Sequence, residues 1–156
     1  MMITDVPYNT TSRLISPGEI KREALGIGSG RVPLYLLFRT LSWYAKNKGF
    51  VVVCAHHLQH GFKVHPQLCI LHNKAADQFY TMINPTLKGF SKEKETRVEE
   101  SVSCGGSKNA KSRYKTIQVR YISHPSKQTM QVEFDGQAAS TLQLVMDEMS
   151  GRYSCT

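Results

Sequence analysis

The sequence predicts one α+β domain with a helix near each end and mostly antiparallel strands between them. Apolar side chains recur at helical spacing around residues 34–45 and 138–149, whereas apolar and polar residues alternate in the middle of the chain. The 156 residues, 40% hydrophobic and 21% charged, suffice for one core and differ from a disordered segment. Because no repeat or linker divides the sequence, we predict a single domain over residues 1–156.

The N-terminal part is predicted to be an irregular lead-in followed by a buried helix. Residues 1–31 contain scattered proline, asparagine, threonine and glycine, which favour loops. The helix is expected over residues 32–48, because Pro33 suits a first turn and Gly49 can end it. Its apolar stripe consists of Leu34, Leu37, Leu41 and Ala45.

Six strands are predicted after this helix, at residues 50–53, 68–71, 79–83, 97–103, 115–122 and 129–134. Residues 107–114 are interpreted as a basic loop that leads into the fifth strand. The last helix is predicted from the spacing of Ala138, Leu142, Val145 and Met149, with Gly151 closing it.

The net charge and the cysteine content indicate which partners the chain attracts and in which redox compartment it works. Twenty Lys and Arg against twelve Asp and Glu give a net charge of +8, which attracts polyanions without conferring specificity. The four cysteines, at 54, 69, 104 and 155, form no CxxC pair and indicate reduced thiols in a cytosol-like compartment. No membrane segment or secretory signal is recognisable in the sequence.

Three short strings carry a resemblance to a known family. They are VVCAHHLQHG at 52–61, EESVS at 99–103 and QLVMDE at 143–148, supported by Asn84-Pro85 and by the strand IQVRY at 117–121. In this order and at these intervals they resemble the three motifs of peptide deformylases, GxGLAAxQ, EGCLS and QHExDH. The resemblance covers residues 32–151 and implies a peptide-deformylase-like α+β fold, with antiparallel sheets around the C-terminal motif helix.

The resemblance also implies a chemistry and shows where this sequence departs from it. Peptide deformylases remove the formyl group from N-terminal methionine with a divalent metal, usually ferrous iron, held by one Cys and two His. Their metal-binding positions fall here on Ser101, Leu144 and Glu148, and the catalytic Glu position falls on Val145. Gln59, at the position that stabilises the oxyanion, is retained, and Asp147 also matches the third motif.

From these replacements we predict a catalytically inactive member that carries no metal cofactor. Leucine and valine offer no lone pair, and a serine hydroxyl is a poor substitute for thiolate on a first-row metal. The remnant groove would then bind a protein or peptide partner by strand addition. Compact members of this kind resemble those of some bacteriophages, so we expect a cytoplasmic protein, in the host cytoplasm if the origin is viral.

Two alternatives remain open. His56, His57 and His60 lie beside the former metal site and, with Glu148, could form a rebuilt site for zinc or iron in a deformylase-like hydrolase. An extended segment would point His56 and His57 in opposite directions. The other alternative is a basic module that contacts the ribosome or other RNA through Lys108, Lys111, Arg113 and Lys115.

Overall fold

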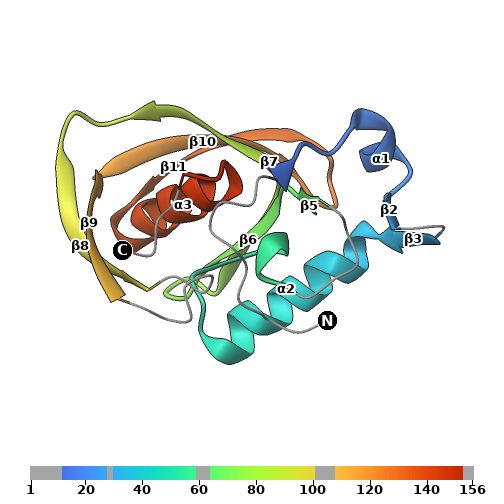
Figure 1. Cartoon of the computed structure of the whole chain (residues 1–156), viewed down its shortest axis with the longest axis horizontal. Helices are drawn as coiled ribbons and strands as arrows, with labels where there is room; N and C mark the ends of the chain where they lie inside the picture. The colour runs from blue at the N-terminus through green and yellow to red at the C-terminus, as the bar shows by residue number, and fades with distance from the viewer. Residues whose placement is uncertain (1–11, 28–29, 59–63, 101–107, 153–156) are drawn as a thin grey trace.

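The computed structural model describes residues 12–27, 30–58, 64–100 and 108–152 (Figure 1). Its helices are α1 (Pro17–Lys21), α2 (Leu34–Lys48), the short 3₁₀ turn η1 (Ala55–His57) and α3 (Gly136–Met149). Its strands are β1 (Ser12–Arg13), β2 (Ala24–Ile27), β3 (Gly30–Pro33), β4 (Val52–Cys54), β5 (His65–Pro66), β6 (Leu68–Asn73), β7 (Gln78–Phe90), β8 (Lys94–Glu100), β9 (Lys108–Tyr114), β10 (Thr116–Ser123) and β11 (Thr129–Asp135). The predicted α+β class is confirmed.

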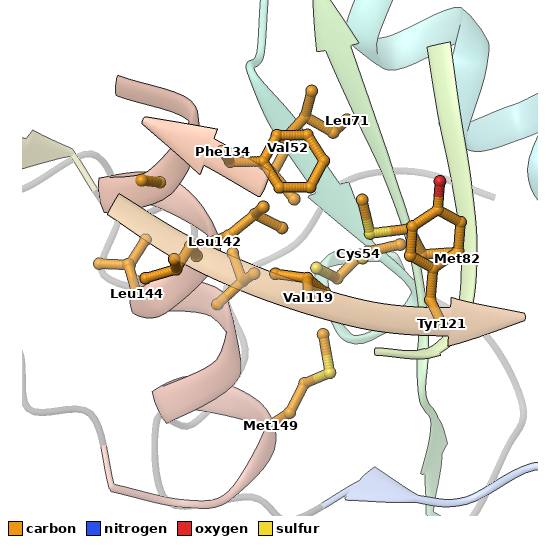
Figure 2. Close-up of a cluster of buried hydrophobic side chains, with 14 residues drawn as sticks. Val52, Cys54, Leu71, Met82, Val119, Tyr121, Phe134, Leu142, Leu144 and Met149 are labelled. Atoms are coloured by element: carbon orange, nitrogen blue, oxygen red, sulfur yellow. The ribbon is translucent and has the colours of Figure 1, made fainter. Parts of the chain in front are cut away.

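The main sheet is antiparallel and has the strand order β11-β10-β7-β6-β4. Its two faces belong to different hydrophobic clusters because successive strand residues point to opposite sides. In β6, Cys69 and Leu71 join the cluster formed with α3 (Figure 2), whereas Leu68 and Ile70 join the cluster formed with α2. The sheet therefore lies between the two long helices (Figure 1).

Both long helices agree with the sequence pattern. The observed α2 begins two residues after the predicted start, buries its predicted stripe, and is followed by Gly49 in the left-handed conformation at φ 73°. In α3, Leu142, Val145 and Met149 are buried, and Gly151 has φ 74° just past the helix end. Glycine adopts the left-handed conformation at little energetic cost, which explains why a glycine follows the C-terminal end of each of these two helices.

The lead-in is more regular than predicted. Residues 12–27 contain β1, α1 and β2, and β2 pairs with β3 as a hairpin. The start of α1 has a capping box: the Glu19 backbone N–H donates to Ser16 Oγ, and the Ser16 N–H donates to Glu19 Oε1. Pro17 follows the cap, as expected for a first helical position. Part of the lead-in therefore carries its own helix signal, which its loop-like composition concealed.

Two strand predictions also differ from the structure. β7 runs to Phe90 instead of ending near residue 83, because Asn84 takes a left-handed φ of 54° and the strand continues beyond Pro85. The Asn84 side chain accepts from the Ile15 N–H at 2.8 Å and donates to the Ile15 carbonyl at 2.9 Å, which fixes this kink to the lead-in. The segment interpreted as a basic loop is β9, paired along its length with β8.

None of the helices in the described part of the chain is long and apolar enough to cross a membrane.

Candidate metal centre and adjoining cavity

Two adjacent histidines and one glutamate meet in the interior. His56 Nε2 lies 3.0 Å from Glu148 Oε1, and His57 Nε2 lies 3.1 Å from the same oxygen. The two imidazole rings are tilted by 57° with centroids 4.1 Å apart. All three side chains are buried. The structure thus brings together three of the four residues of the rebuilt-site hypothesis, whereas His60 lies outside the described residues.

The local backbone explains why both histidines reach one carboxylate. β4 ends at Cys54, and the chain then enters the 3₁₀ turn η1. Successive residues of a 3₁₀ turn are rotated by about 120°, against about 180° in a strand, so neighbouring side chains can share a target. The expectation that His56 and His57 point in opposite directions, which assumed an extended segment, is therefore wrong. Glu148 comes from the last turn of α3.

The hydrogen bonds assign the proton on His57. The backbone N–H of Cys54 donates to His57 Nδ1 at 3.0 Å, so this nitrogen must be unprotonated. A neutral His57 then carries its proton on Nε2 and donates it to Glu148. The turn and the glutamate together fix both the orientation and the tautomer of this ring.

The electrostatics keep the cluster in a form suited to metal binding. Burial, with a smaller effect of the neighbouring His57, lowers the pKa of His56 to about 4, so His56 is neutral near pH 7. Burial favours a raised pKa for Glu148, but hydrogen bonds from His56 and His57 outweigh it and hold the pKa well below the usual range. The neutral imidazole of His56 and the ionised carboxylate of Glu148 are the protonation states that metal ligation requires.

Cys54 is a further donor next to the histidines. Ligand atoms of Cys54, His56 and His57 all lie within 4.8 Å of one another. Cys54 faces Cys69 across the β4–β6 ladder, and both are free and fully buried. Burial raises the pKa of the Cys54 thiol, with Cys69 and Glu148 adding to the rise. A coordinated metal overcomes such a rise because it deprotonates a ligating thiol outright.

This donor set fits a divalent ion. Two histidines with one carboxylate, or two histidines with one cysteine, are ligand sets used by zinc and non-haem iron. Ligand atoms around tetrahedral zinc lie roughly 3.4 Å apart. The 3.0 and 3.1 Å contacts to Glu148 need only a small opening to reach that spacing. Ligation through His57 Nε2 would move the ring proton to Nδ1, and the bond from the Cys54 N–H would be lost.

A cavity of about 850 Å³ lies beside this cluster, with His57 in its wall. Its buried lining includes Val52, Leu144 and Val145, while exposed residues such as Lys48 and Lys108 form its solvent side. Leu144 and Val145, which the resemblance places at a ligand and the catalytic position, are therefore apolar wall residues. Gln59 and Ser101, the other two family positions, lie outside the described residues.

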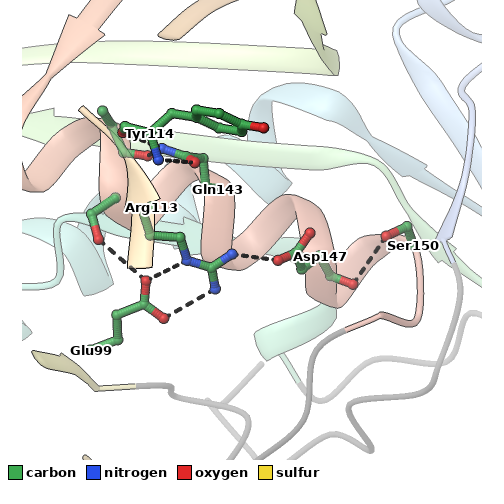
Figure 3. Close-up of polar contacts among 8 residues, drawn as sticks. Glu99, Arg113, Tyr114, Gln143, Asp147 and Ser150 are labelled. Atoms are coloured by element: carbon green, nitrogen blue, oxygen red, sulfur yellow. Dashed lines mark hydrogen bonds and ion pairs between the residues drawn. The ribbon is translucent and has the colours of Figure 1, made fainter. Parts of the chain in front are cut away.

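A second polar network borders the cavity (Figure 3). Arg113 Nε and Nη2 donate to the two oxygens of Glu99 at 2.7 and 3.1 Å, and Nη1 donates to Asp147 at 2.5 Å. Ser140 Oγ adds a bond to Glu99 at 3.2 Å. Glu99 lines the cavity and is buried. This fork-like pairing ties β8 and β9 to α3.

The proposed RNA-binding residues are placed in different surroundings. Arg113 is engaged by two carboxylates, and Lys115 Nζ lies 3.6 Å from Glu93. Lys108 lines the cavity, and Lys111 is half-buried on β9. Contact of these residues with RNA stays a prediction.

The chain is similar to known proteins both in sequence and in structure. The model of the family described as polypeptide deformylase matches residues 48–155. None of the curated proteins matches the chain by sequence.

Three solved structures illustrate the structural likeness. A class I type b peptide deformylase from Acinetobacter baumannii with bound Met-Ala-Ser has a TM-score of 0.72 at 17% identity, with 96% of each chain covered. A probable peptide deformylase from Synechococcus phage S-SSM7 has a TM-score of 0.75 at 15% identity, covering 97% of this chain and 95% of that one. The enzyme of Vibrio parahaemolyticus bacteriophage VP16T, in complex with actinonin, has a TM-score of 0.74 at 18% identity, covering 97% and 98%.

The prediction of no metal cofactor is wrong. It rested on the replacements at the inherited ligand positions 101, 144 and 148, whereas the structure assembles Cys54, His56 and His57 as a group able to hold an ion. Sequence reasoning passed over Cys54 because it occupies a family glycine position; the local string Cys-x-His-His at a strand end was the available signal. The sequence match covers more than two thirds of a chain that also has the expected fold. The protein belongs to the polypeptide deformylase family.

Proposed function

We propose that this chain is a metal-dependent hydrolase of deformylase type, acting on the acylated N-terminus of a peptide. His56, His57 and Glu148 hold the ion, as the rebuilt-site hypothesis expected, and Cys54 is an additional donor. The observation that carries the proposal is the convergence of both Nε2 atoms on one carboxylate oxygen beside a cavity. A divalent ion in this place supplies the Lewis acid that polarises an amide carbonyl.

The chain's own residues define the rest of the site. His57 belongs both to the cluster and to the cavity wall, so a ligand in the cavity reaches the cluster there. Val145 offers no group for proton transfer, and His56, His57 and Glu148 would be engaged as metal ligands, so none of these four residues is free to serve as the general base. A positioned general base contributes about 10²–10⁴-fold to a rate. We therefore expect slow turnover compared with a member that has glutamate at this position.

A peptide can approach the cluster along two strand edges. In the described part of the chain, β4 is an edge strand of the main sheet, and its Val52 lines the cavity. Val98 and Glu99 of β8 line the cavity as well. Backbone groups at strand edges are free to pair with an extended chain. The Acinetobacter relative has a Met-Ala-Ser peptide bound, which is consistent with a peptide-binding fold.

The same features support an alternative, in which the chain binds a protein or peptide partner without cleaving it. The valine at position 145 favours this reading, because it removes a proton-transfer group without closing the cavity. A binding protein with a structural metal would satisfy every contact described above. Activity measurements must separate the two.

Metal content is the first test. Protein purified without a histidine tag, stripped with a chelator and reloaded with Zn²⁺ or Fe²⁺, should hold about one ion per chain and release protons on loading. The variant His57→Ala should lose the ion. His72→Ala is the matched control, because His72 is also buried and bonds a carboxylate, Asp77, at 2.9 Å but has no second histidine on that carboxylate. Equal metal loss in both variants, or no metal in the parent, would overturn the site.

Formate release from formyl-Met-Ala-Ser is the second test. We expect slow, metal-dependent release that is abolished in Glu148→Gln and retained in His72→Ala. Cobalt loading then shows whether Cys54 is a donor as well. A thiolate–cobalt bond has a charge-transfer absorption, and the variant Cys54→Ser would remove it. Metal binding without formate release would reject the hydrolase and leave the peptide-binding protein.

A further inference from the structure

We infer that the cavity beside His57 selects an anionic ligand, namely an N-acyl peptide with carboxylates on the residues that follow its first. The inference rests on the proposed function, because it assigns the substrate class of the same site. Three features of the cavity carry it: the cations in its wall, the engagement of its carboxylate, and the separation of its apolar and polar lining.

Four cationic side chains from four separate segments converge on this cavity. Lys48 ends α2, Lys74 lies in the turn after β6, Arg97 belongs to β8 and Lys108 begins β9. These segments are distant in sequence, so the folded structure creates this cluster. Positive groups that line a concave surface attract anions more strongly than the same charges spread over a convex one.

The single carboxylate that lines the cavity in the described part of the chain does not offset this charge. It belongs to Glu99, which is already held by two bonds from Arg113 and one from Ser140. Arg97 is paired with Glu95 at 3.0 Å, an exposed pair that a ligand can share. Lys74 Nζ donates to the Gly49 carbonyl, which orients the ammonium group without neutralising it. A ligand carboxylate would therefore meet cationic side chains whose charge the carboxylates of the described cavity lining do not fully neutralise.

The arrangement of the lining residues indicates where along a bound peptide the carboxylates would lie. Val52, Leu144 and Val145 form the buried apolar part of the lining, and Leu144 and Val145 lie one turn of α3 away from Glu148, the partner of His57. Thr141 and the exposed Gln137 lie one and two turns farther from Glu148 along α3 and line the same cavity, as do the exposed Lys48 and Lys108. A small or apolar group therefore suits the end near His57, and carboxylates suit the positions that lie toward solvent. An acyl group followed by an apolar residue and then acidic residues has this order.

Direct binding of matched peptides tests the inference. The probes are formyl-Met-Glu-Glu-amide, its neutral isostere formyl-Met-Gln-Gln-amide and formyl-Met-Lys-Lys-amide, titrated calorimetrically into the metal-loaded and the chelator-treated protein. We expect the glutamate peptide to bind about tenfold tighter than the glutamine peptide, because two or three partly exposed ion pairs contribute a few-fold each. The lysine peptide should bind weakest, and added salt should reduce the preference.

Two substitutions locate the effect. Replacing Lys48 and Lys108 together by Gln should bring the preference for glutamate close to unity. Lys21→Gln, on α1 and away from the cavity lining, changes the net charge of the chain but should keep the preference. A fourth probe, formyl-Met-Gln-Gln with a free C-terminal carboxylate, shows whether the terminal carboxylate can replace the side chains. Equal affinities, a preference for lysine, loss of preference in Lys21→Gln, or no binding of any probe would overturn the inference.

These results remain separable from the hydrolase proposal. Tenfold preference in a protein that releases no formate would support an anion-selective cavity and reject the hydrolase. Formate release with no preference between the glutamate and glutamine peptides would do the reverse. The binding measurement needs no turnover, so failure of one proposal does not conceal the outcome of the other.

Discussion

At the scale of single residues, Arg113 is paired with two carboxylates at once. It neutralises Glu99, whose side chain is 4% exposed, and it reaches Asp147 on α3. Burying a carboxylate without a partner costs several kcal/mol. Arg113 therefore helps to attach β8 and β9 to α3, together with the Ser140–Glu99 bond and the two bonds between Gln143 and the Tyr114 backbone.

We predict that Arg113→Met destabilises the protein by about 3 to 5 kcal/mol, because Glu99 is left buried and uncompensated. Urea unfolding followed by circular dichroism measures the loss. Arg97→Met is the matched control, since its pair with Glu95 is 40% and 36% exposed and should cost under about 1 kcal/mol. Adding Glu99→Gln to Arg113→Met should recover part of the stability. Similar losses for both arginine variants would contradict this role.

The sequence predicted part of the candidate site. His56, His57 and Glu148 could be named because two histidines stand in a family motif and a carboxylate stands at a family ligand position. Their convergence on one oxygen could not be predicted, because it depends on a three-residue 3₁₀ turn that propensity does not specify. The pairing of Glu99 with Arg113, 14 residues later in the sequence, could not be predicted either, because it depends on the β8–β9 register.

At the scale of elements, α1 is held by one ion pair. Arg13 Nη1 and Nη2 donate to the two oxygens of Glu19 at 2.8 Å each. Hydrogen bonding from Arg13 lowers the pKa of Glu19 to about 2. A carboxyl group with a depressed folded-state pKa stabilises the fold above its unfolded pKa, and this contribution disappears as pH falls through the folded value.

We therefore predict that Glu19→Gln costs about 1 to 2 kcal/mol at pH 7, with the partial exposure of Arg13 limiting the effect. The difference between parent and variant should fall to less than half by pH 3 and nearly vanish at pH 2. Urea midpoints at each pH provide the measurement. Glu93→Gln serves as the control, because Glu93 is 77% exposed and lies 3.6 Å from Lys115. A pH-independent difference would show that the charge is not responsible.

The elements themselves were predicted where local pattern and tertiary packing agree. The two long helices and the strands at 115–122 and 129–134 carry clear periodicity, and the strand at 68–71 is a continuous apolar run. β9 was missed because its residues are mostly polar and basic; its strand conformation comes from pairing with β8. The strand predicted at 79–83 ended too early because a proline such as Pro85 normally ends a strand. Here Asn84 accommodates the kink, and β7 continues to Phe90.

At the scale of the whole molecule, the central sheet joins two hydrophobic clusters. Val52 and Cys54 of β4 face α3, while Val53 between them faces α2. β4, β6 and β7 each contribute to both clusters, so neither cluster can lose its packing without disturbing strands of the other. This arrangement supports the prediction of one domain, since the two layers share their backbone.

We predict that Leu142→Ala, in the α3 cluster, lowers the stability reported from the α2 side of the sheet. Leu142 is fully buried, so the substitution should cost about 2 to 5 kcal/mol. Trp43, the single tryptophan, lies on α2, and its fluorescence should follow the same lowered transition as circular dichroism. Leu14→Ala is the control, because Leu14 is 65% exposed and should change the midpoint little. If Trp43 kept the parent midpoint while circular dichroism shifted, the two clusters would unfold independently and the single-domain prediction would be wrong.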